Sequence, residues 1–236
     1  MRRRDVLALG VAAAAMAMAM AAPGASASPG RRVGFVFVGA EGGWQIGGSG
    51  LSLLGAEYSA KWLGLLKTAA PSIARAGLVW NPESPVGRLE MKRVEAAAAA
   101  LAMTVAPLSV QPAEVETSFA EIDDLKVDSL VVFDDALCGA YLQRIVELSA
   151  KRRLPTLYGF DEAVRLGGLM SYSTNFFEIW RRAGYHVARI LQGARAAELP
   201  IEQATEIALR LNLKAAAQLG LDMPQSLLAA AAKVIE

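Results

Sequence analysis

The stretch "SLVVF", Ser129 to Phe133, contains four consecutive large apolar residues. Strands with one face in water alternate apolar and polar residues, so an unbroken apolar run indicates a strand that is covered on both faces, as in a parallel sheet. Four further runs have a similar character: Ala76–Trp80, Met103–Val110, Pro155–Phe160 and Gly168–Tyr172. The sequence therefore predicts five short strands of one buried sheet.

Segments with helical periodicity lie between and after these strands. Apolar residues recur at three- and four-residue spacing from Met91 to Leu101 and from Tyr141 to Leu148. We expect a third helix from Phe176 to Leu191 and a fourth in "NLKAAAQLG", Asn212 to Gly220, where the final glycine suits a helix stop. Strands that alternate with helices predict an α/β fold with one Rossmann-like, doubly wound, mostly parallel sheet.

A glycine-rich stretch near the start of the chain raises the question of a phosphate-binding loop. In "VGFVFVGAEGGWQIGGSGLSLL", Val33 to Leu54, an apolar strand runs into a tryptophan-bearing glycine loop. A dinucleotide fingerprint needs a third glycine in register, and a P-loop needs Gly-Lys-Ser/Thr, but Gly50 is followed by Leu51. The loop therefore fits neither type of phosphate site.

The first 27 residues have the features of a secretory signal peptide. Arg2, Arg3 and Arg4 precede an apolar run from Val6 to Ala22, and "ASA" at Ala25 to Ala27 provides a small-residue cleavage site. We expect cleavage after Ala27 and export by the Sec or the twin-arginine route, because "RRDVL" also resembles a twin-arginine signal. An uncleaved membrane anchor is disfavoured by the short, alanine-rich run.

Composition argues against several functions. Acidic and basic residues are interspersed and the formal net charge is +1, so no nucleic-acid surface is expected. The chain has one cysteine, Cys138, and one histidine, His186, which leaves no Cys/His metal cluster and no internal disulfide. We expect both residues to have packing roles and predict no metal or cofactor.

Ligands of open parallel sheets bind at the carboxyl ends of the strands, so the residues that follow the predicted strands are the candidate site. The predicted ligand-binding residues are Asn81, Ser84, Asp134, Asp135, Tyr158, Phe160, Ser171 and Tyr172. An aromatic, hydroxyl-rich rim with carboxylates suits a small zwitterion or polar organic solute. An aspartate would pair with a ligand ammonium, and the rings would stack on its apolar part.

Each of these residues also has a structural interpretation. Asp134 and Asp135 precede a helix, and helix capping explains them about as well as ligand binding does. Asn81 before a proline is a good turn, and Tyr158 and Tyr172 fit aromatic positions at the edge of a core. Paired aspartates also suit acid–base catalysis, but no histidine, cysteine or lysine joins them at the other strand ends, so we predict no enzyme.

Three segments resemble ABC-transporter substrate-binding proteins of the tryptophan/tyrosine type. They are "LSLLGAEYSAKWLGLLKTAAPSIARAGLVWNPESP" (Leu51 to Pro85), "RRLPTLYGFDEAVRLGGLMSYSTN" (Arg152 to Asn175) and "ILQGARAAELPIEQATEIALRLNLKAAAQLGLDMP" (Ile190 to Pro224). The resemblance implies a periplasmic-binding-protein-like fold with two α/β lobes that close on a small solute. It also implies a periplasmic receptor that delivers this solute to a membrane permease.

The resemblance has one departure, at the glycine loop. In the family, the first strand is followed by several more βα units, whereas here Val38 is followed almost at once by "GGWQIGGSGLSLL". We therefore expect a signal peptide at 1–27, a remnant of the N-terminal lobe at 28–55 and one α/β substrate-binding lobe at 56–236. Apolar surface left by a missing lobe would favour a homodimer.

Three functions follow from these observations. The leading one is a periplasmic substrate-binding component of an ABC importer for a small organic solute, an amino acid among the candidates, in truncated form. The second is a lobe without a ligand, which serves as an interaction module or survives as a remnant. The third is a small exported enzyme that uses Asp134 and Asp135.

Overall fold

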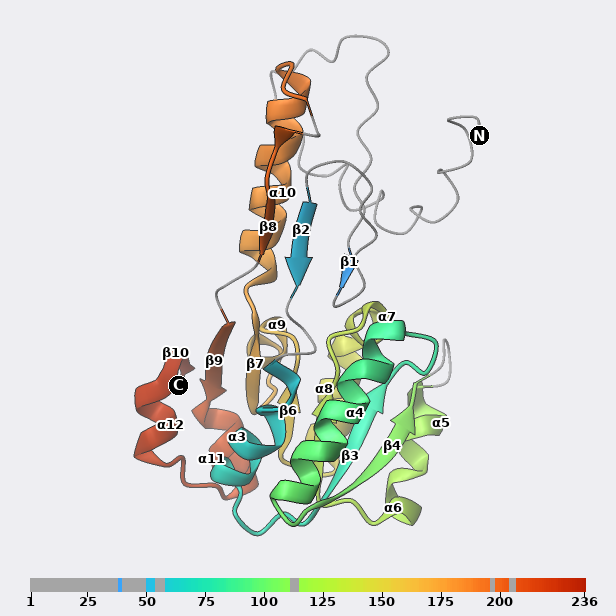
Figure 1. Ribbon diagram of the computed structural model, residues 1–236. Helices are drawn as coiled ribbons and strands as arrows, with labels where there is room; N and C mark the ends of the chain where they lie inside the picture. Colours follow the sequence, from blue (N-terminus) through green and yellow to red (C-terminus); the bar gives the residue numbers. More distant parts are fainter. Residues whose placement is uncertain (1–37, 40–49, 54–57, 111–114, 196–197, 204–206) are drawn as a thin grey trace. The chain divides into compact units, whose positions relative to one another are not determined.

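The computed structural model describes residues 38–39, 50–53, 58–110, 115–195, 198–203 and 207–236 (Figure 1). The predicted signal peptide and most of the glycine loop lie outside these residues. The chain divides into two compact units: the first comprises Met1–Val38, Gly42–Ser52 and Phe177–Gln203, and the second Gly39–Glu41, Leu53–Phe176 and Ala204–Glu236. The second unit contains most of the lobe predicted for 56–236, and the domain boundaries given above stay a prediction.

A seven-stranded sheet forms the centre of the second unit, in the order β10-β9-β7-β6-β5-β3-β4. Its strands are β3 (Arg75–Trp80), β4 (Thr104–Ser109), β5 (Ser129–Val132), β6 (Thr156–Tyr158), β7 (Met170–Thr174), β9 (Ile207–Asn212) and β10 (Ala231–Ile235). All neighbouring pairs are parallel except β7 and β9. The mostly parallel α/β sheet predicted from the sequence is confirmed.

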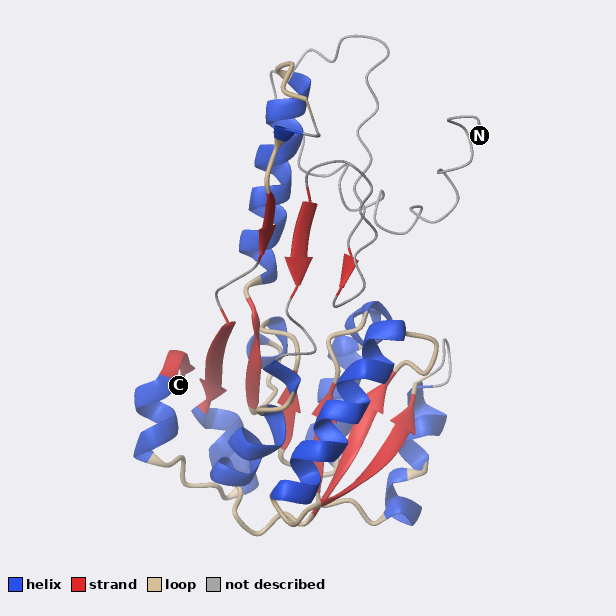
Figure 2. Cartoon of the chain, in the orientation of Figure 1, coloured by secondary structure: helices blue, strands red, loops and turns tan. Residues whose placement is uncertain are grey.

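Helices cover both faces of this sheet (Figure 2). One face carries α3 (Trp62–Ala69), α4 (Pro85–Ala100), α11 (Leu213–Leu219) and α12 (Gln225–Ala230) over the first core cluster. The other carries α5 (Val115–Ala120), α6 (Ile122–Leu125), α7 (Ala136–Ala140), α8 (Leu142–Lys151) and α9 (Glu162–Arg165) over the second core cluster. Val131 lies in the first cluster and its neighbours Leu130 and Val132 in the second, which explains the unbroken apolar run.

Local signals in the sequence set several helix ends. Ser84 caps α4 by accepting a hydrogen bond from the Gly87 N–H at 3.1 Å, and Pro85 occupies the first helical position. Asn212 caps α11, and this helix ends at Gly220, whose φ of 73° is in the left-handed region. The helix stop predicted at this glycine is confirmed.

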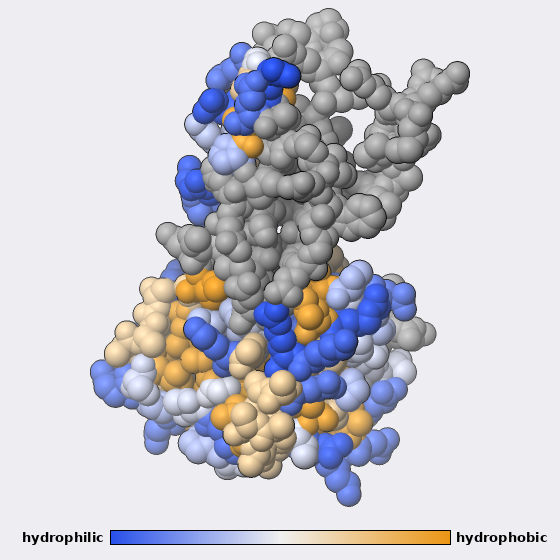
Figure 3. Space-filling view, viewed as in Figure 1, coloured by the Kyte–Doolittle hydropathy of each residue, from blue (hydrophilic) through white to orange (hydrophobic). Residues whose placement is uncertain are grey.

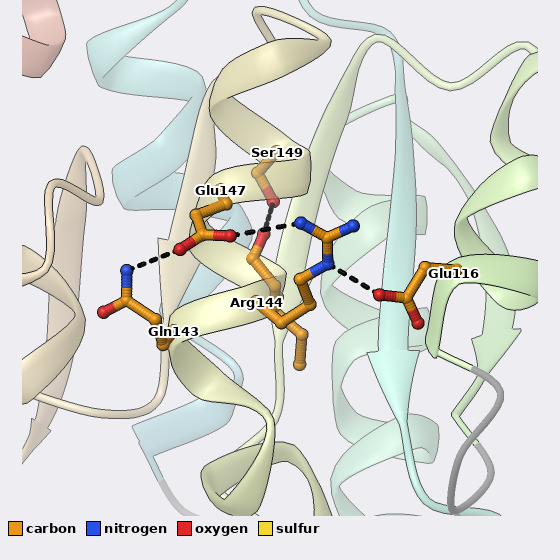
Figure 4. A network of polar contacts seen from close by, with 6 residues as sticks. Glu116, Gln143, Arg144, Glu147 and Ser149 are labelled. Atoms are coloured by element: carbon orange, nitrogen blue, oxygen red, sulfur yellow. Dashed lines mark hydrogen bonds and ion pairs between the residues drawn. The ribbon is translucent and has the colours of Figure 1, made fainter.

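Polar contacts on the surface join α5 to α8. The Arg144 Nε lies 2.6 Å from the Glu116 Oε1, and the Arg144 Nη1 lies 3.2 Å from the Glu147 Oε2 (Figure 4). About half of each side chain is exposed, so these ion pairs contribute little to stability. On the face of the second unit seen in Figure 3, hydrophilic residues are interspersed with hydrophobic ones.

The first unit contains a three-stranded sheet in the order β1-β2-β8, with β1 (Val38–Gly39), β2 (Gly50–Leu53) and β8 (Ile201–Gln203). Strand β2 pairs with β8 in parallel. Most of α10 (Phe176–Leu191) belongs to this unit, and its bounds are those predicted from the sequence. In α10 the side chain of His186 is buried, and its ring meets that of Tyr185 edge-on at 6.2 Å. Among the described residues, no helix is long and apolar enough to cross a membrane.

Candidate functional site

The parallel strands of the second unit bring the predicted site residues to one edge of the sheet. Val79 pairs with Val132, Val132 with Tyr158, and Tyr158 with Ser171, so β3, β5 and β6 end side by side, level with Ser171 of β7. Strand β7 continues to Thr174, so Ser171 and Tyr172 lie within this strand. The predicted site residues therefore come from the ends of three strands and from the neighbouring β7. This edge is where ligands bind in open parallel sheets.

Asp134 is partly buried, and its carboxyl group lies on the side of α3 and α4. Tyr58 stands just before α3, and its hydroxyl donates a hydrogen bond to the Asp134 Oδ2. Burial raises the pKa of Asp134, and hydrogen bonds from Glu90 and Tyr58 act in the opposite direction. Gly159 leaves room for this arrangement, because a Cβ there would come within 2.8 Å of the Asp134 backbone nitrogen and of its Cβ.

Glu90, on α4, is the second carboxyl group of this cluster, and it is the more deeply buried one. Only 1% of its surface is exposed. Burial is the main cause that raises the pKa of Glu90, and the nearby Asp134 is the next. Two carboxyl groups in one site of low dielectric do not both ionise, so at least one proton stays on the pair near neutral pH. A proton on Glu90 allows this residue to donate a hydrogen bond to Asp134, while the Glu90 Oε1 is buried without a partner among the described residues.

An aromatic group packs beside the acid cluster. The Trp62 Nε1 donates to the backbone carbonyl of Tyr172 at 2.9 Å. The ring of Tyr58 lies 5.8 Å from Trp62 and 6.1 Å from Tyr172, both edge-on. The Lys61 Nζ lies 5.9 Å from the centre of the Tyr172 ring, and this ring is partly exposed. Tyr172 is thus the aromatic residue of this group that a solute can reach.

Asp135 and Asn81 contact each other and shape the helix starts. The Asp135 Oδ1 accepts from the Leu137 N–H at 2.8 Å and from the Asn81 Nδ2 at 3.1 Å. Asp135 is therefore the cap of α7, as the structural interpretation of the pair suggested, and Asp134 is not that cap. A ligand contact by Asn81, Ser84 or Asp135 stays a prediction.

Tyr158 and Phe160 lie on the other face of the sheet, in and against the second core cluster. Tyr158 is 1% exposed, and burial raises the pKa of its hydroxyl to about 12. The Phe160 ring packs against α7, where a Cβ on Gly139 would lie 3.2 Å from it. The structure thus brings Phe160 to the rim and holds Tyr158 below it, and the ligand contacts predicted for both stay predictions.

Cys138 of α7 is fully buried beneath this rim. Its Sγ lies 3.8 Å from the carbonyl oxygen of Val79, and burial raises the pKa of the thiol. The described residues contain no group of three or more His, Cys, Asp or Glu side chains that could hold a metal ion. The packing role expected of Cys138 fits this position.

Three residues of this edge were missed by sequence reasoning: Tyr58, Glu90 and Arg210. The Arg210 Nη2 lies 3.8 Å from the Asp161 Oδ2, and their side chains are only 14% and 13% exposed. The sequence contained a signal for two of them, since a charged residue at an apolar position indicates a buried charge. Glu90 stands four residues before Val94 on the apolar face of its helix, and Arg210 interrupts an apolar strand. Tyr58 gave no signal, because only the tertiary fold places it beside Asp134.

The family model of the ABC transporter substrate binding proteins matches residues 49–235. The chain therefore belongs to this family, a family of solute-binding proteins and not of enzymes. No curated protein matches.

Solved structures show the same fold. An ABC domain in complex with L-Trp from Streptococcus pneumonia is similar over 79% of this chain, with a TM-score of 0.70 and 22% identity. A conserved domain protein from Vibrio cholerae also has a TM-score of 0.70 over 79% of this chain, at 23% identity. A ligand-free, open substrate binding protein with adhesive properties from Clostridium difficile has a TM-score of 0.56 and 20% identity, again over 79% of this chain. The matches cover only 62–64% of the three relatives.

Proposed function

We propose that the protein is the substrate-binding component of an ABC importer and that it binds a small organic solute, with an amino acid as the foremost candidate. The observation that carries the proposal is the family match over residues 49–235. The similarity to a protein solved with L-Trp supports an amino acid as the solute. A periplasmic location and delivery to an inner-membrane permease belong to the same proposal.

The strand ends of the seven-stranded sheet carry side chains that would suit such a solute. Tyr172 offers a partly exposed ring, while Asn81 and Asp135 offer polar groups at adjacent strand ends. Asp134 is less available, since it is partly buried and its carboxylate already accepts from Tyr58. We therefore place the apolar part of the solute against Tyr172, and its polar groups along the ends of β3, β5 and β6.

A lobe that binds no solute and acts as an interaction module or remnant is the alternative. The matches cover 62–64% of the relatives, so the part of the fold that they share with this chain holds fewer of the groups that enclose a ligand. A homodimer would bury further surface and could in this way enclose a solute. The exported enzyme is the weakest proposal, because Asp134 is engaged with Tyr58 and Glu90.

A thermal-shift screen of the purified chain against amino acids, small organic acids and sugars tests the proposal. A solute present at a hundredfold its dissociation constant adds about 2.7 kcal/mol to the free energy of unfolding, which is readily measured. We expect a shift with one class of solute. A sharp melting transition that no compound moves would support the lobe without a ligand.

A further inference from the structure

A series of contacts joins the buried acid of α4 to the partly exposed ring of Tyr172. Glu90 donates a hydrogen bond to Asp134, and the Tyr58 hydroxyl donates to the same carboxylate. The Tyr58 ring in turn meets the Tyr172 ring edge-on at 6.1 Å. We call Glu90, Asp134 and Tyr58 the Asp134 network. Its members come from a helix, a strand end and the segment before α3, and together they reach one aromatic side chain of the rim.

Trp62 holds the backbone of Tyr172 from the same segment. Its Nε1 donates to the Tyr172 carbonyl at 2.9 Å. Its ring lies 5.8 Å from that of Tyr58 and 5.4 Å from that of Phe133. The Tyr172 ring itself is contacted by Tyr58 and, from the exposed side, by the Lys61 Nζ at 5.9 Å. Tyr58 is thus the buried aromatic neighbour that can set the orientation of this ring.

Stability does not explain a glutamate at position 90. The side chain lies on the buried face of α4 with Met91 and Val94. Its Oε1 is buried and, within the part of the chain that the structure describes, has no hydrogen-bond partner. Such an atom lowers stability, and an apolar side chain of similar volume at a buried charged position is often neutral or stabilising. The hydrogen bond from Glu90 therefore indicates a role in holding the Asp134 carboxylate.

Two donors fix the direction of that carboxylate. Asp134 is partly exposed, so its side chain is free to turn toward water unless other groups hold it. Glu90 and the Tyr58 hydroxyl approach it from different elements. Burial raises the pKa of Tyr58, so its hydroxyl keeps the proton that it donates. Hydrogen bonds to a carboxylate are short and strong, and Asp134 thereby fixes the position of the Tyr58 ring.

We propose that Glu90 and Tyr58 are positioning residues of the solute site, which act through Asp134 to hold the Tyr172 ring in the orientation that meets the solute. This inference rests on the proposed function, in which the apolar part of the solute lies against Tyr172. Glu90 is 1% and Tyr58 2% exposed, so their effect on the solute is indirect. Without either donor the Tyr172 ring becomes more mobile and loses more conformational entropy on binding, which lowers the affinity.

The first measurement follows the Tyr172 ring in the absence of solute. The chain has five tyrosines, so NMR of protein with isotope-labelled tyrosine rings gives few signals, and Tyr172→Phe identifies the one from Tyr172. The neighbouring aromatic rings should shift this signal away from that of free tyrosine. We expect it to move toward the free value in Tyr58→Phe and in Glu90→Met. It should stay in place in Glu90→Gln, because glutamine still donates to Asp134.

The second measurement is the affinity for L-tryptophan by isothermal titration, since a similar protein was solved with this amino acid. Glu90→Met and Tyr58→Phe should each weaken binding about 3- to 30-fold, the range for residues that act on a site without touching its ligand. Glu90→Gln should retain the affinity of the unmodified protein. Glu95→Met and Tyr185→Phe make the same chemical changes at exposed positions and should leave the affinity unchanged.

The melting temperature distinguishes a positioning role from general damage to the fold. Near pH 7, Glu90→Met should not lower it, because the change removes a buried oxygen that has no partner among the described residues. Lower affinity without lower stability is the pattern that a positioning residue produces. Should Glu90→Met fail to fold, Tyr58→Phe decides, since it keeps the buried ring and removes only the hydroxyl.

The outcomes separate the inference from the proposed function. Unchanged affinity in Glu90→Met and Tyr58→Phe would overturn the positioning roles and leave the receptor in place. A Tyr172 signal that is the same in both variants would do so as well. If L-tryptophan does not bind, the compound with the largest thermal shift replaces it as the probe. If no amino acid, organic acid or sugar binds, the proposed function fails, and the Tyr172 signal alone decides whether the Asp134 network holds the ring.

Discussion

Replacing Glu90 by glutamine should change how the stability of the protein depends on pH. Glu90 is 1% exposed and lies beside Asp134, so it is protonated in the folded chain near neutral pH. In the unfolded chain a glutamate with the ordinary pKa of 4.5 is ionised. Folding therefore takes up one proton at this residue, and the free energy of unfolding falls as pH rises above the ordinary pKa.

The size of the effect follows from that single proton. One proton taken up on folding gives a slope of about −1.4 kcal/mol per pH unit. Between pH 6 and pH 8, Glu90→Gln should gain about 2.7 kcal/mol relative to the unmodified protein. Glutamine keeps the shape of the side chain and still donates a hydrogen bond to Asp134, so no cavity complicates the comparison.

The assay is urea unfolding of both proteins at pH 6, 7 and 8. Glu95→Gln is the matched control, because it makes the same chemical change on the exposed side of the same helix and should leave the pH dependence as it is. Parallel stability curves for Glu90→Gln and the unmodified protein would refute the reasoning. They would show that Glu90 is ionised in the folded chain.

Two further changes test the packing at the carboxyl ends of the strands, and a third tests a helix cap at the opposite end of the sheet. Gly159→Ala should destabilise by about 1–3 kcal/mol, because the new Cβ meets Asp134 at 2.8 Å, and urea unfolding would show it. Trp62→Phe should cost about 1–3 kcal/mol by the same assay, since the partly buried carbonyl of Tyr172 loses its donor at 2.9 Å. Asn212→Ala removes the cap of α11 and should lower the free energy of unfolding by about 1 kcal/mol; an unchanged midpoint would argue against the cap.

The sequence predicted those parts of the fold whose signals are local. The apolar run at residues 130–133 correctly predicted a buried strand, because core clusters cover both faces of β5. Gly220 correctly predicted a helix end, because it adopts a left-handed φ. Strand β9 was missed. Its six residues stand between an undescribed segment and α11, and no local pattern shows that it runs antiparallel beside β7.

The site was less predictable, because its contacts join distant parts of the chain. Tyr58 and Asp134 are 76 residues apart, so only the packing of α3 on the sheet brings them together. Strand alternation places Arg210 on the face opposite Leu209 and Leu211. Whether that face is open or covered depends on α9, which begins with Glu162. Helix capping, in contrast, was one of the two interpretations given for the Asp134–Asp135 pair, because the cap formed by Asp135 depends on its own helix alone.

The reaction rate of the buried Cys138 thiol can report local opening of the protein. An aromatic disulfide reagent reacts with thiolate, and here both the lack of exposure and the raised pKa of the thiol prevent attack in the closed state. Labelling therefore proceeds through transient separation of α7 from β3, and its rate measures how often that separation occurs. Since the chain has one cysteine, the signal comes from this position alone. A solute that tightens the strand ends should slow the reaction, and no cysteine has to be introduced for the measurement.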